Sequence, residues 1–119
     1  MNTRIEFEED AQADLLSAAV RFYEVEEYQL CMNLLHVLMV CGNKESYVLA
    51  GHCISESGYM GDMELSNQYY KVSCEMGSAV GCYNLYLNNL ETDRVMASKF
   101  LKRAKDLGWV DLEDTNSDG

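Results

Sequence analysis

The stretch EMGSAVGCYNL, residues 75–85, carries the signals that end one helix and start the next. Gly77 follows a run with helical apolar spacing, and glycine readily takes the positive φ that closes a helix. Ser78 is a favourable N-cap for the helix that follows. Equivalent glycines stand at Gly42 and Gly108, which gives intervals of 35 and 31 residues. A period of this size with helical patterning inside it is typical of stacked helix hairpins.

The segments before the three glycines can be aligned, and they share a pattern of small and large side chains. Eleven residues before each glycine stands a small residue: Cys31, Ser66 and Ala97. Eight and seven residues before each glycine stands a large apolar or aromatic pair: Leu34-Leu35, Tyr69-Tyr70 and Phe100-Leu101. Spacings of three and four residues place these positions on one side of a helix. We therefore expect the small positions to be buried where neighbouring helices approach, with the large ones filling the space between hairpins.

These residues are similar to the Sel1-like repeat, a relative of the tetratricopeptide repeat that is common in bacteria. The match is clearest over residues 62–77, followed by Ala79 and by residues 83–85. The third copy shares a further set: Asp93, Ala97, Phe100, Ala104 and Gly108. The first copy matches more loosely: Tyr28, Cys31, Leu34-Leu35 and Gly42. One departure is Tyr86, which stands where the family has a glycine that this chain keeps at Gly51.

The resemblance covers residues 11–112. It implies an all-α protein, an α-solenoid of about six helices in three antiparallel hairpins, like the superhelix of Sel1-like and tetratricopeptide proteins. We expect a single domain over residues 1–112. Its hairpins are expected over three ranges: 3–42, 43–77 and 78–108. Residues 113–119 are acidic, polar and small, and we expect a disordered tail there.

Helix ends are predicted from capping residues and apolar runs. Thr3 and Glu6 have the spacing of a capping box, so the first helix is expected to begin at Thr3. Four residues are expected to cap later helices: Asn43, Asp62, Ser78 and Thr92. The second helix, expected from Tyr28 to Cys41, is apolar on most sides. We expect it to form the buried centre of the stack.

The composition fits this architecture. The chain has 119 residues, of which 48% are hydrophobic, and it contains no proline. That is enough for one domain with a core, and the lack of proline suits a nearly all-helical chain. No apolar run reaches about 18 residues, so no transmembrane helix is expected. Residues 1–10 are acidic and lack the apolar centre of a secretory signal, so we expect a cytoplasmic protein.

Five cysteines are present, an odd number, and none forms a Cys-x-x-Cys pair. This pattern favours reduced thiols that act as small hydrophobic residues, and it disfavours a zinc site. We expect Cys31, Cys53 and Cys74 to be buried free thiols. No metal and no cofactor is expected.

The formal net charge is −11, and it is unevenly distributed. Residues 1–92 carry four basic and fourteen acidic side chains, whereas residues 93–108 carry five basic and two acidic ones. The negative charge argues against a nucleic acid or an anionic membrane as the partner. It favours a basic protein as the partner, or serves solubility alone.

The sequence contains no convincing catalytic arrangement, so we do not expect an enzyme. His36 lies on the very apolar second helix, where a partly buried structural histidine is expected. His52 is next to Cys53, but neighbours in a helix point about 100° apart and do not form a dyad. Motifs for a serine-hydrolase nucleophile, a zinc protease or a phosphate-binding loop are absent from the sequence.

Stacked repeats present an extended surface rather than a deep cavity, which suits protein binding. Some proteins of the resembled family are bacterial immunity proteins. A small, single-domain, acidic chain fits an inhibitor that binds and neutralises a basic bacterial toxin, such as a nuclease. The alternative is a cytosolic Sel1-like adaptor or scaffold for a regulatory or assembly partner. An enzyme and a purely structural oligomer are the less favoured classes.

The residues expected to bind the partner form three groups. Acidic residues are expected to steer association: Asp14, Glu24, Glu26 and Glu27. Tyrosines are expected to anchor the partner, because by the resemblance the first helix of each hairpin lines the concave face: Tyr47, Tyr83 and Tyr86. His52, on the same helix as Tyr47, completes the set. For Tyr83 the alternative role is packing between repeats.

Overall fold

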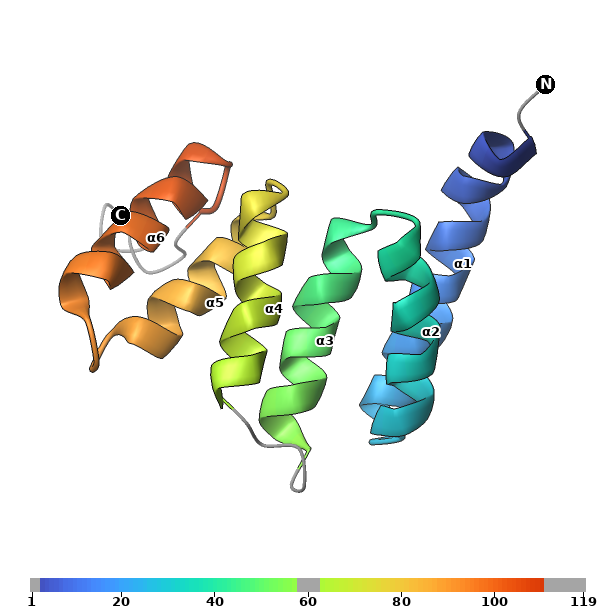
Figure 1. Ribbon diagram of the computed structural model, residues 1–119, viewed down its shortest axis with the longest axis horizontal. Helices are drawn as coiled ribbons and strands as arrows, with labels where there is room; N and C mark the ends of the chain where they lie inside the picture. Colours follow the sequence, from blue (N-terminus) through green and yellow to red (C-terminus); the bar gives the residue numbers. More distant parts are fainter. Residues whose placement is uncertain (1–2, 58–62, 111–119) are drawn as a thin grey trace, which may run out of the picture.

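The computed structural model describes residues 3–57 and 63–110, with side chains from residue 9 onward. In this part of the chain it contains six helices and no strand: α1 (Thr3–Glu24), α2 (Tyr28–Val40), α3 (Lys44–Glu56), α4 (Met63–Glu75), α5 (Ala79–Asn89) and α6 (Arg94–Asp106). Figure 1 shows them following one another along the long axis of the molecule. The predicted all-α solenoid, with helices in three antiparallel hairpins, is confirmed.

Each helix packs mainly on its neighbours in the chain. The most extensive contacts are within the pairs α1–α2, α3–α4 and α5–α6, which are the predicted hairpins. In addition, α2 packs on α3 and α4 packs on α5, so the hairpins are stacked on one another. Smaller contacts join α1 to α3 and α3 to α5. The odd-numbered helices therefore lie side by side as one layer of the stack.

The turns between hairpins have the predicted chemistry. Three glycines have φ values of 79°, 99° and 108°: Gly42, Gly77 and Gly108. This left-handed conformation closes a helix at little steric cost only when the residue has no Cβ. The side chain of Asn43 accepts a hydrogen bond from the backbone N–H of Ser46 at 3.0 Å. Ser78 Oγ accepts one from the backbone N–H of Gly81 at 3.1 Å, so both predicted N-caps are confirmed.

The predicted cap of the sixth helix, Thr92, is wrong by one residue. Helix α6 begins at Arg94, and Asp93 is its N-cap, with a carboxylate oxygen accepting from the N–H of Met96 at 3.1 Å. A carboxylate in this position also interacts favourably with the positive end of the helix dipole. The first helix begins at Thr3 as predicted. Three other predictions lie outside the residues whose side chains are described: the Thr3–Glu6 capping box, the cap at Asp62 and the tail at 113–119.

Two hydrophobic clusters form the core. One joins α1, α2 and α3: Ala19, Cys31, Met32, Leu35, Leu38, Leu49, Ala50 and Cys53. The other joins α3 to α6: Val48, Tyr70, Cys74, Cys82, Leu85 and Ala104. Ser66 and Ala97 are 0% and 1% exposed, as the pattern of small residues predicts. Helices α3 and α4 approach closely at Gly51, where an added Cβ would lie 2.4 Å from the ring of Tyr70.

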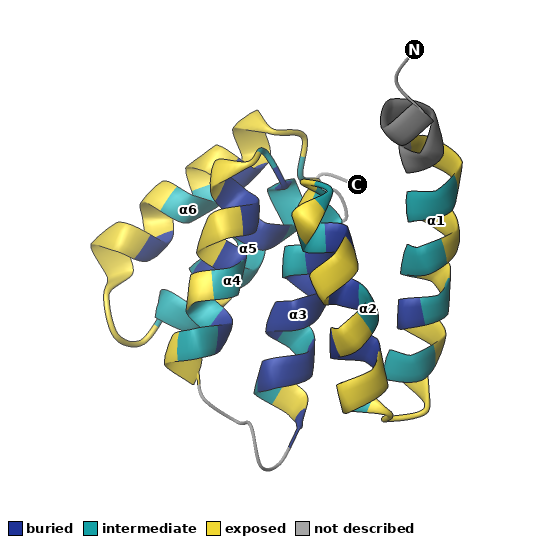
Figure 2. Ribbon diagram, turned by 45° about the vertical axis from the view of Figure 1, so that its right-hand side comes forward, coloured by how far each residue is buried: buried dark blue, intermediate teal, exposed yellow. Residues whose placement is uncertain are grey.

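Helix α2 is not the buried centre of the stack, contrary to the prediction. One side is buried: Cys31, Met32, Leu35 and Leu38. On the other side, Leu30 is 46% exposed, Val37 is 47% exposed and Val40 is 89% exposed. The reason is that α2 packs mainly on α1 and α3, which cover only part of its circumference. Figure 2 shows exposed residues alternating with buried ones along α2.

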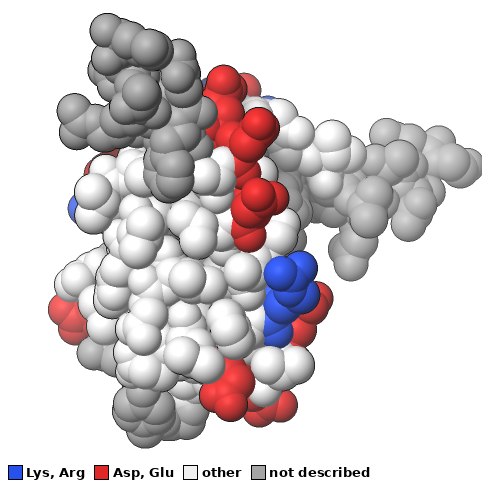
Figure 3. Space-filling view, turned by 90° about the vertical axis from the view of Figure 1, so that its right-hand side faces the viewer, with Lys and Arg blue, Asp and Glu red and all other residues white. Residues whose placement is uncertain are grey.

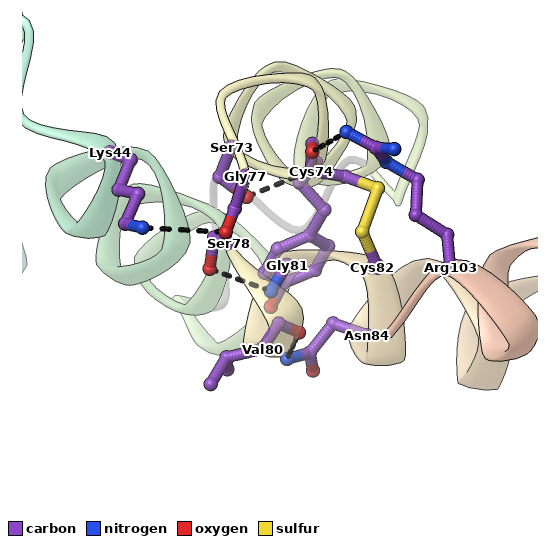
Figure 4. Close-up of a disulfide and its surroundings, with 11 residues drawn as sticks. Lys44, Ser73, Cys74, Gly77, Ser78, Val80, Gly81, Cys82, Asn84 and Arg103 are labelled. Carbon is purple, nitrogen blue, oxygen red and sulfur yellow. Dashed lines mark hydrogen bonds between the residues drawn. A yellow bond between two sulfur atoms is a disulfide. The ribbon is translucent and has the colours of Figure 1, made fainter. Parts of the chain in front are cut away.

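Cys74 and Cys82 form a disulfide, so the prediction that Cys74 is a free thiol is wrong. Cys74 lies in the last turn of α4 and Cys82 in the first turn of α5, with their Cα atoms 4.7 Å apart (Figure 4). The turn at Gly77 and Ser78 folds α5 back onto α4, which brings together two residues eight positions apart. The other cysteines are free, and Cys31 and Cys53 are buried as predicted.

Further hydrogen bonds fix the same junction. The C-terminal carbonyl groups of a helix have no partner within the helix, and cationic side chains commonly bind them. Lys44 of α3 donates to the carbonyl oxygen of Gly77 at 3.3 Å, and Arg103 of α6 donates to that of Cys74 at 3.2 Å. Figure 4 shows both side chains pointing at the end of α4. The C-terminal end of α4 and the turn after it are thus held by α3 on one side and α6 on the other.

None of the described helices has both the length and the apolar character that a bilayer crossing requires.

Candidate protein-binding surfaces

The four acidic residues predicted to steer a partner all belong to the first hairpin and are all exposed. Asp14 lies in the middle of α1, and Glu24 is the last residue of that helix. Glu26 and Glu27 form the turn that leads into α2, and Glu26 adopts a φ of 63°. Glu24, Glu26 and Glu27 therefore concentrate three carboxylates at one end of the hairpin.

Further carboxylates extend this acidic surface along α1. Glu9 and Asp10 are exposed on the N-terminal part of the helix, while Arg21 is the basic residue of its last turn. Figure 3 views the molecule from the α1–α2 end and shows acidic side chains, interrupted by a basic one, in a line beside a broad area without charged residues. No group of three or more His, Cys, Asp or Glu side chains in the described residues is placed to hold a metal ion.

The predicted tyrosine anchors are half-buried and pack against other aromatic rings. The Tyr47 ring lies 6.4 Å from that of Tyr69, centroid to centroid. Tyr83 stacks on Trp109 at 4.1 Å and also contacts Tyr86, whose ring centroid is 5.4 Å away. The stacked geometry gives Tyr83 a packing role, because one face of its ring is occupied, but the contact lies within the last hairpin and not between repeats as the alternative role expected.

Trp109 is a packing residue that the sequence reasoning missed. It follows Gly108 directly and packs against the second core cluster. Val110, the next residue, is exposed and does not share this role. The signal available in the sequence was the chain's single tryptophan, placed one residue after a helix-closing glycine.

His52 lies in a network of aromatic and polar side chains between α1, α3 and α4. Its Nδ1 and the hydroxyl of Tyr70 share a hydrogen bond of 2.6 Å. The ring of Tyr23 lies 6.3 Å away, and the Tyr23 hydroxyl donates to the carboxylate of Glu56. Burial lowers the pKa of His52, and nearby Glu56 opposes that shift. These contacts give His52 a packing role in addition to any contact with a partner.

One hollow opens between α4, α5 and α6, with a volume of about 650 Å³. Its lining is mostly polar: Glu64, Asn67, Gln68, Lys71, Leu85, Asn89, Asp93, Met96 and Phe100. A hydrogen bond of 2.8 Å between Asn88 and Asn67 ties α5 to α4 near it. The hollow is broad and open, and it includes none of the eight residues predicted to bind a partner.

Comparison of the chain with protein-family models, with curated proteins and with solved structures finds no match. The class of protein is therefore defined here by the fold alone: a small all-α protein with helix hairpins stacked as in helical-repeat proteins.

The structure brings some of the predicted site residues together and separates others. Three acids meet at the α1–α2 turn, and Tyr83 contacts Tyr86 on α5. Helix α3 lies between α1 and α5 in the stack (Figure 1), so the acids and the α5 tyrosines occupy different positions along the molecule. The surface next to the acids is instead the exposed side of α2, which sequence reasoning had assigned to the core.

Proposed function

We propose that this chain is a non-enzymatic protein-binding module, related to Sel1-like repeat proteins, that binds and neutralises a basic bacterial toxin such as a nuclease. The observation that supports this proposal most is the concentration of exposed carboxylates on the first hairpin. Residues 3–42 contain eight acidic and two basic side chains, and every acidic side chain described there is exposed. The partner is then a protein whose active surface is rich in Lys and Arg.

The physical role of these carboxylates is mainly kinetic. Exposed charges interact over about 10 Å at 0.1 M salt and about 3 Å at 1 M. They accelerate encounter with an oppositely charged surface and add less to the lifetime of the complex. An inhibitor that must reach its target quickly benefits from this steering. The broad, open hollow on α4–α6 gives no comparable support to a small-molecule enzyme.

A second candidate is a cytosolic adaptor, and one observation favours it. Residues 93–108, which include α6, carry five basic and two acidic side chains, so the far end of the stack has the opposite charge. A protein with an acidic end and a basic end can hold two different partners. The disulfide weighs against the cytosol, because disulfides persist mainly in oxidising compartments.

The test is capture of partners from the source cell by the immobilised full chain, followed by association kinetics with each captured protein. We expect a basic protein whose association rate falls by about tenfold or more between 0.1 M and 1 M salt. Replacing Glu24, Glu26 and Glu27 with Gln should slow association mainly at low salt. The matched control carries the same charge change elsewhere, Glu75→Gln, Glu91→Gln and Asp106→Asn, and should retain a faster association rate.

An acidic partner, or association that is indifferent to salt, would show that the proposed function is wrong. If the partner is basic, inhibition is then tested directly by adding the chain to the purified partner in an activity assay. Loss of the partner's activity at equimolar chain supports an inhibitor. Retained activity together with a second simultaneous partner supports the adaptor.

A further inference from the structure

The exposed side of α2 is apolar and without charge. Helix α2 has the sequence YQLCMNLLHVLMV and contains no Asp, Glu, Lys or Arg. Its exposed residues are Gln29, Leu30, Asn33, His36, Val37 and Val40. Leu30, Val37 and Val40 are spaced by seven and then three residues, so they lie along one side of the helix. We call these three residues and the exposed polar residues between them the α2 face.

Single exposed apolar residues are common on proteins, but a continuous apolar strip is typical of an interaction site. The α2 face combines three exposed apolar side chains along one side of the helix with exposed Asn33 and His36 between them, it has no charged residue of the Asp, Glu, Lys or Arg type, and Val40 is almost fully exposed. A surface helix without a binding role usually carries charged side chains on its solvent side. Helices α4 and α6 follow that rule, with Glu64, Lys71 and Glu75 on one and six charged residues on the other.

Acidic residues border the α2 face on two sides. Glu24, Glu26 and Glu27 precede the N-terminus of α2, and α1, which packs on α2, carries further exposed carboxylates. In Figure 3 the uncharged area and the line of acidic side chains are adjacent. A ligand that buries its apolar side chains on α2 therefore brings its flanking residues close to carboxylates, which favours Lys and Arg at those positions.

The same charges disfavour two other occupants. A second copy of the chain would bring two molecules of net charge −11 together with their acidic borders. The C-terminal segment 111–119 contains four acidic and no basic residues, so the acidic borders would repel it too. An anionic membrane is excluded for the same reason.

We infer that the α2 face is the docking surface for an amphipathic helical segment of the partner, whose apolar side is flanked by Lys and Arg. The inference rests on the proposed function for the sign of the partner's charge. A helix that covers α2 along its 13 residues needs a similar length, about 20 Å or three to four turns. Contacts of this kind use apolar anchors at helical spacing for affinity, with charged flanks setting orientation and partner choice.

The probe is a fluorescent amphipathic peptide of about 14 residues, made of Leu and Lys at helical spacing so that it spans about 20 Å. Two control peptides accompany it: one with Glu in place of every Lys, and one with the Leu/Lys composition in scrambled order. Binding to the full chain is measured by fluorescence anisotropy. We expect the amphipathic Leu/Lys peptide to bind at least tenfold more tightly than either control.

Two variants and a matched control locate the site. Val37→Asp and Val40→Asp place a charge on the α2 face and should each raise the Kd of the Leu/Lys peptide by about tenfold. Val95→Asp introduces the same change on α6, where Val95 is 71% exposed, and should leave the Kd unchanged. Circular dichroism and a thermal melt confirm that each variant remains folded, which is expected because these valines are exposed.

The following outcomes would overturn the inference. If the peptide does not bind, or if Val37→Asp and Val40→Asp bind as the unaltered chain does, the α2 face is not the docking surface. The proposed function survives that result when salt-sensitive capture of a basic protein still holds. If the Leu/Glu peptide binds equally well, the preference for basic partners fails, and the proposed function loses its basis too. If sedimentation shows a dimer that Val40→Asp dissociates, the occupant is a second copy.

Discussion

His52 illustrates how a single side chain in this fold links packing to pH. It is half-buried on α3 and shares a hydrogen bond with the hydroxyl of Tyr70, which is itself buried. Removing water from the imidazole disfavours its charged form, so the pKa of His52 is lowered below the ordinary value of 6.5. The exposed His36 on α2 makes a useful comparison, because it lacks this burial.

We predict that His52 makes the protein less stable as the pH falls below about 6.5. The unfolded chain binds a proton at His52 more readily than the folded chain does, so stability is fully present above the unfolded pKa and is lost as the pH falls toward the folded one. The measurement is the thermal midpoint between about pH 7.5 and pH 5.5, either side of the ordinary histidine pKa. His52→Gln should flatten this dependence, and the control His36→Gln should keep it. An identical slope in the His52 variant would contradict the assignment.

At the scale of helices, several constraints act together at the junction between α4 and α5. It combines the helix-closing Gly77, the N-cap Ser78 and the disulfide between Cys74 and Cys82. Space is also short there, since an added Cβ at Gly81 would lie 1.9 Å from Ser73 Oγ. The two hairpins that meet at this junction are therefore held in one relative orientation by covalent and steric contacts together.

We predict that Cys74→Ala with Cys82→Ala lowers the free energy of unfolding by about 2–3 kcal/mol, the loop-closure entropy expected for a loop of this length. Urea unfolding measures the change. The unaltered chain in the presence of a reductant should approach the stability of the double variant. The control Cys41→Ala, which leaves the disulfide intact, should respond to reductant as the unaltered chain does. A urea midpoint that changes neither with reductant nor with the substitutions would show that the disulfide does not contribute to stability.

At the scale of the whole molecule, the core is divided between two clusters along the stack. Ala19 of α1 belongs to the first cluster and Ala104 of α6 to the second, and both are fully buried. Stability in stacked hairpins is approximately a sum of hairpin and interface contributions. Changes at opposite ends should therefore act independently.

We predict that Ala19→Gly and Ala104→Gly each lower the free energy of unfolding by about 1 kcal/mol, the helix propensity difference, and somewhat more where the lost methyl was packed. The double variant should lose the sum of the two to within about 0.5 kcal/mol, because the sites share no neighbours. Urea unfolding monitored by circular dichroism gives all four values. The comparison pair, Ala19→Gly with Ala50→Gly, lies in one cluster and is expected to deviate from additivity. If the free energies of unfolding deviate from additivity by the same amount in both pairs, the core is single and undivided.

The sequence alone determined the helical architecture of this protein. Helix ends depend on local chemistry, so Gly42, Gly77 and Gly108 could be recognised as helix-closing residues, and Asn43 and Ser78 as caps. The small side chains of Ser66 and Ala97 indicated close helix packing, which the structure confirms. These features involve residues a few positions apart, whose interactions are fixed once a helix forms.

Tertiary structure decided the rest, because it depends on which surfaces meet. Cys74 and Cys82 are paired because the turn between α4 and α5 brings their Cα atoms to 4.7 Å, which no cysteine spacing pattern indicates. The apolar sequence of α2 predicts a core helix. Its exposure depends on how many neighbouring helices cover it, and because α2 packs mainly on α1 and α3, Val37 and Val40 remain exposed. The apolar side chains of a helix determine how much free energy their burial would contribute. Whether they are buried within this chain or left for a partner to cover depends on how the other helices pack.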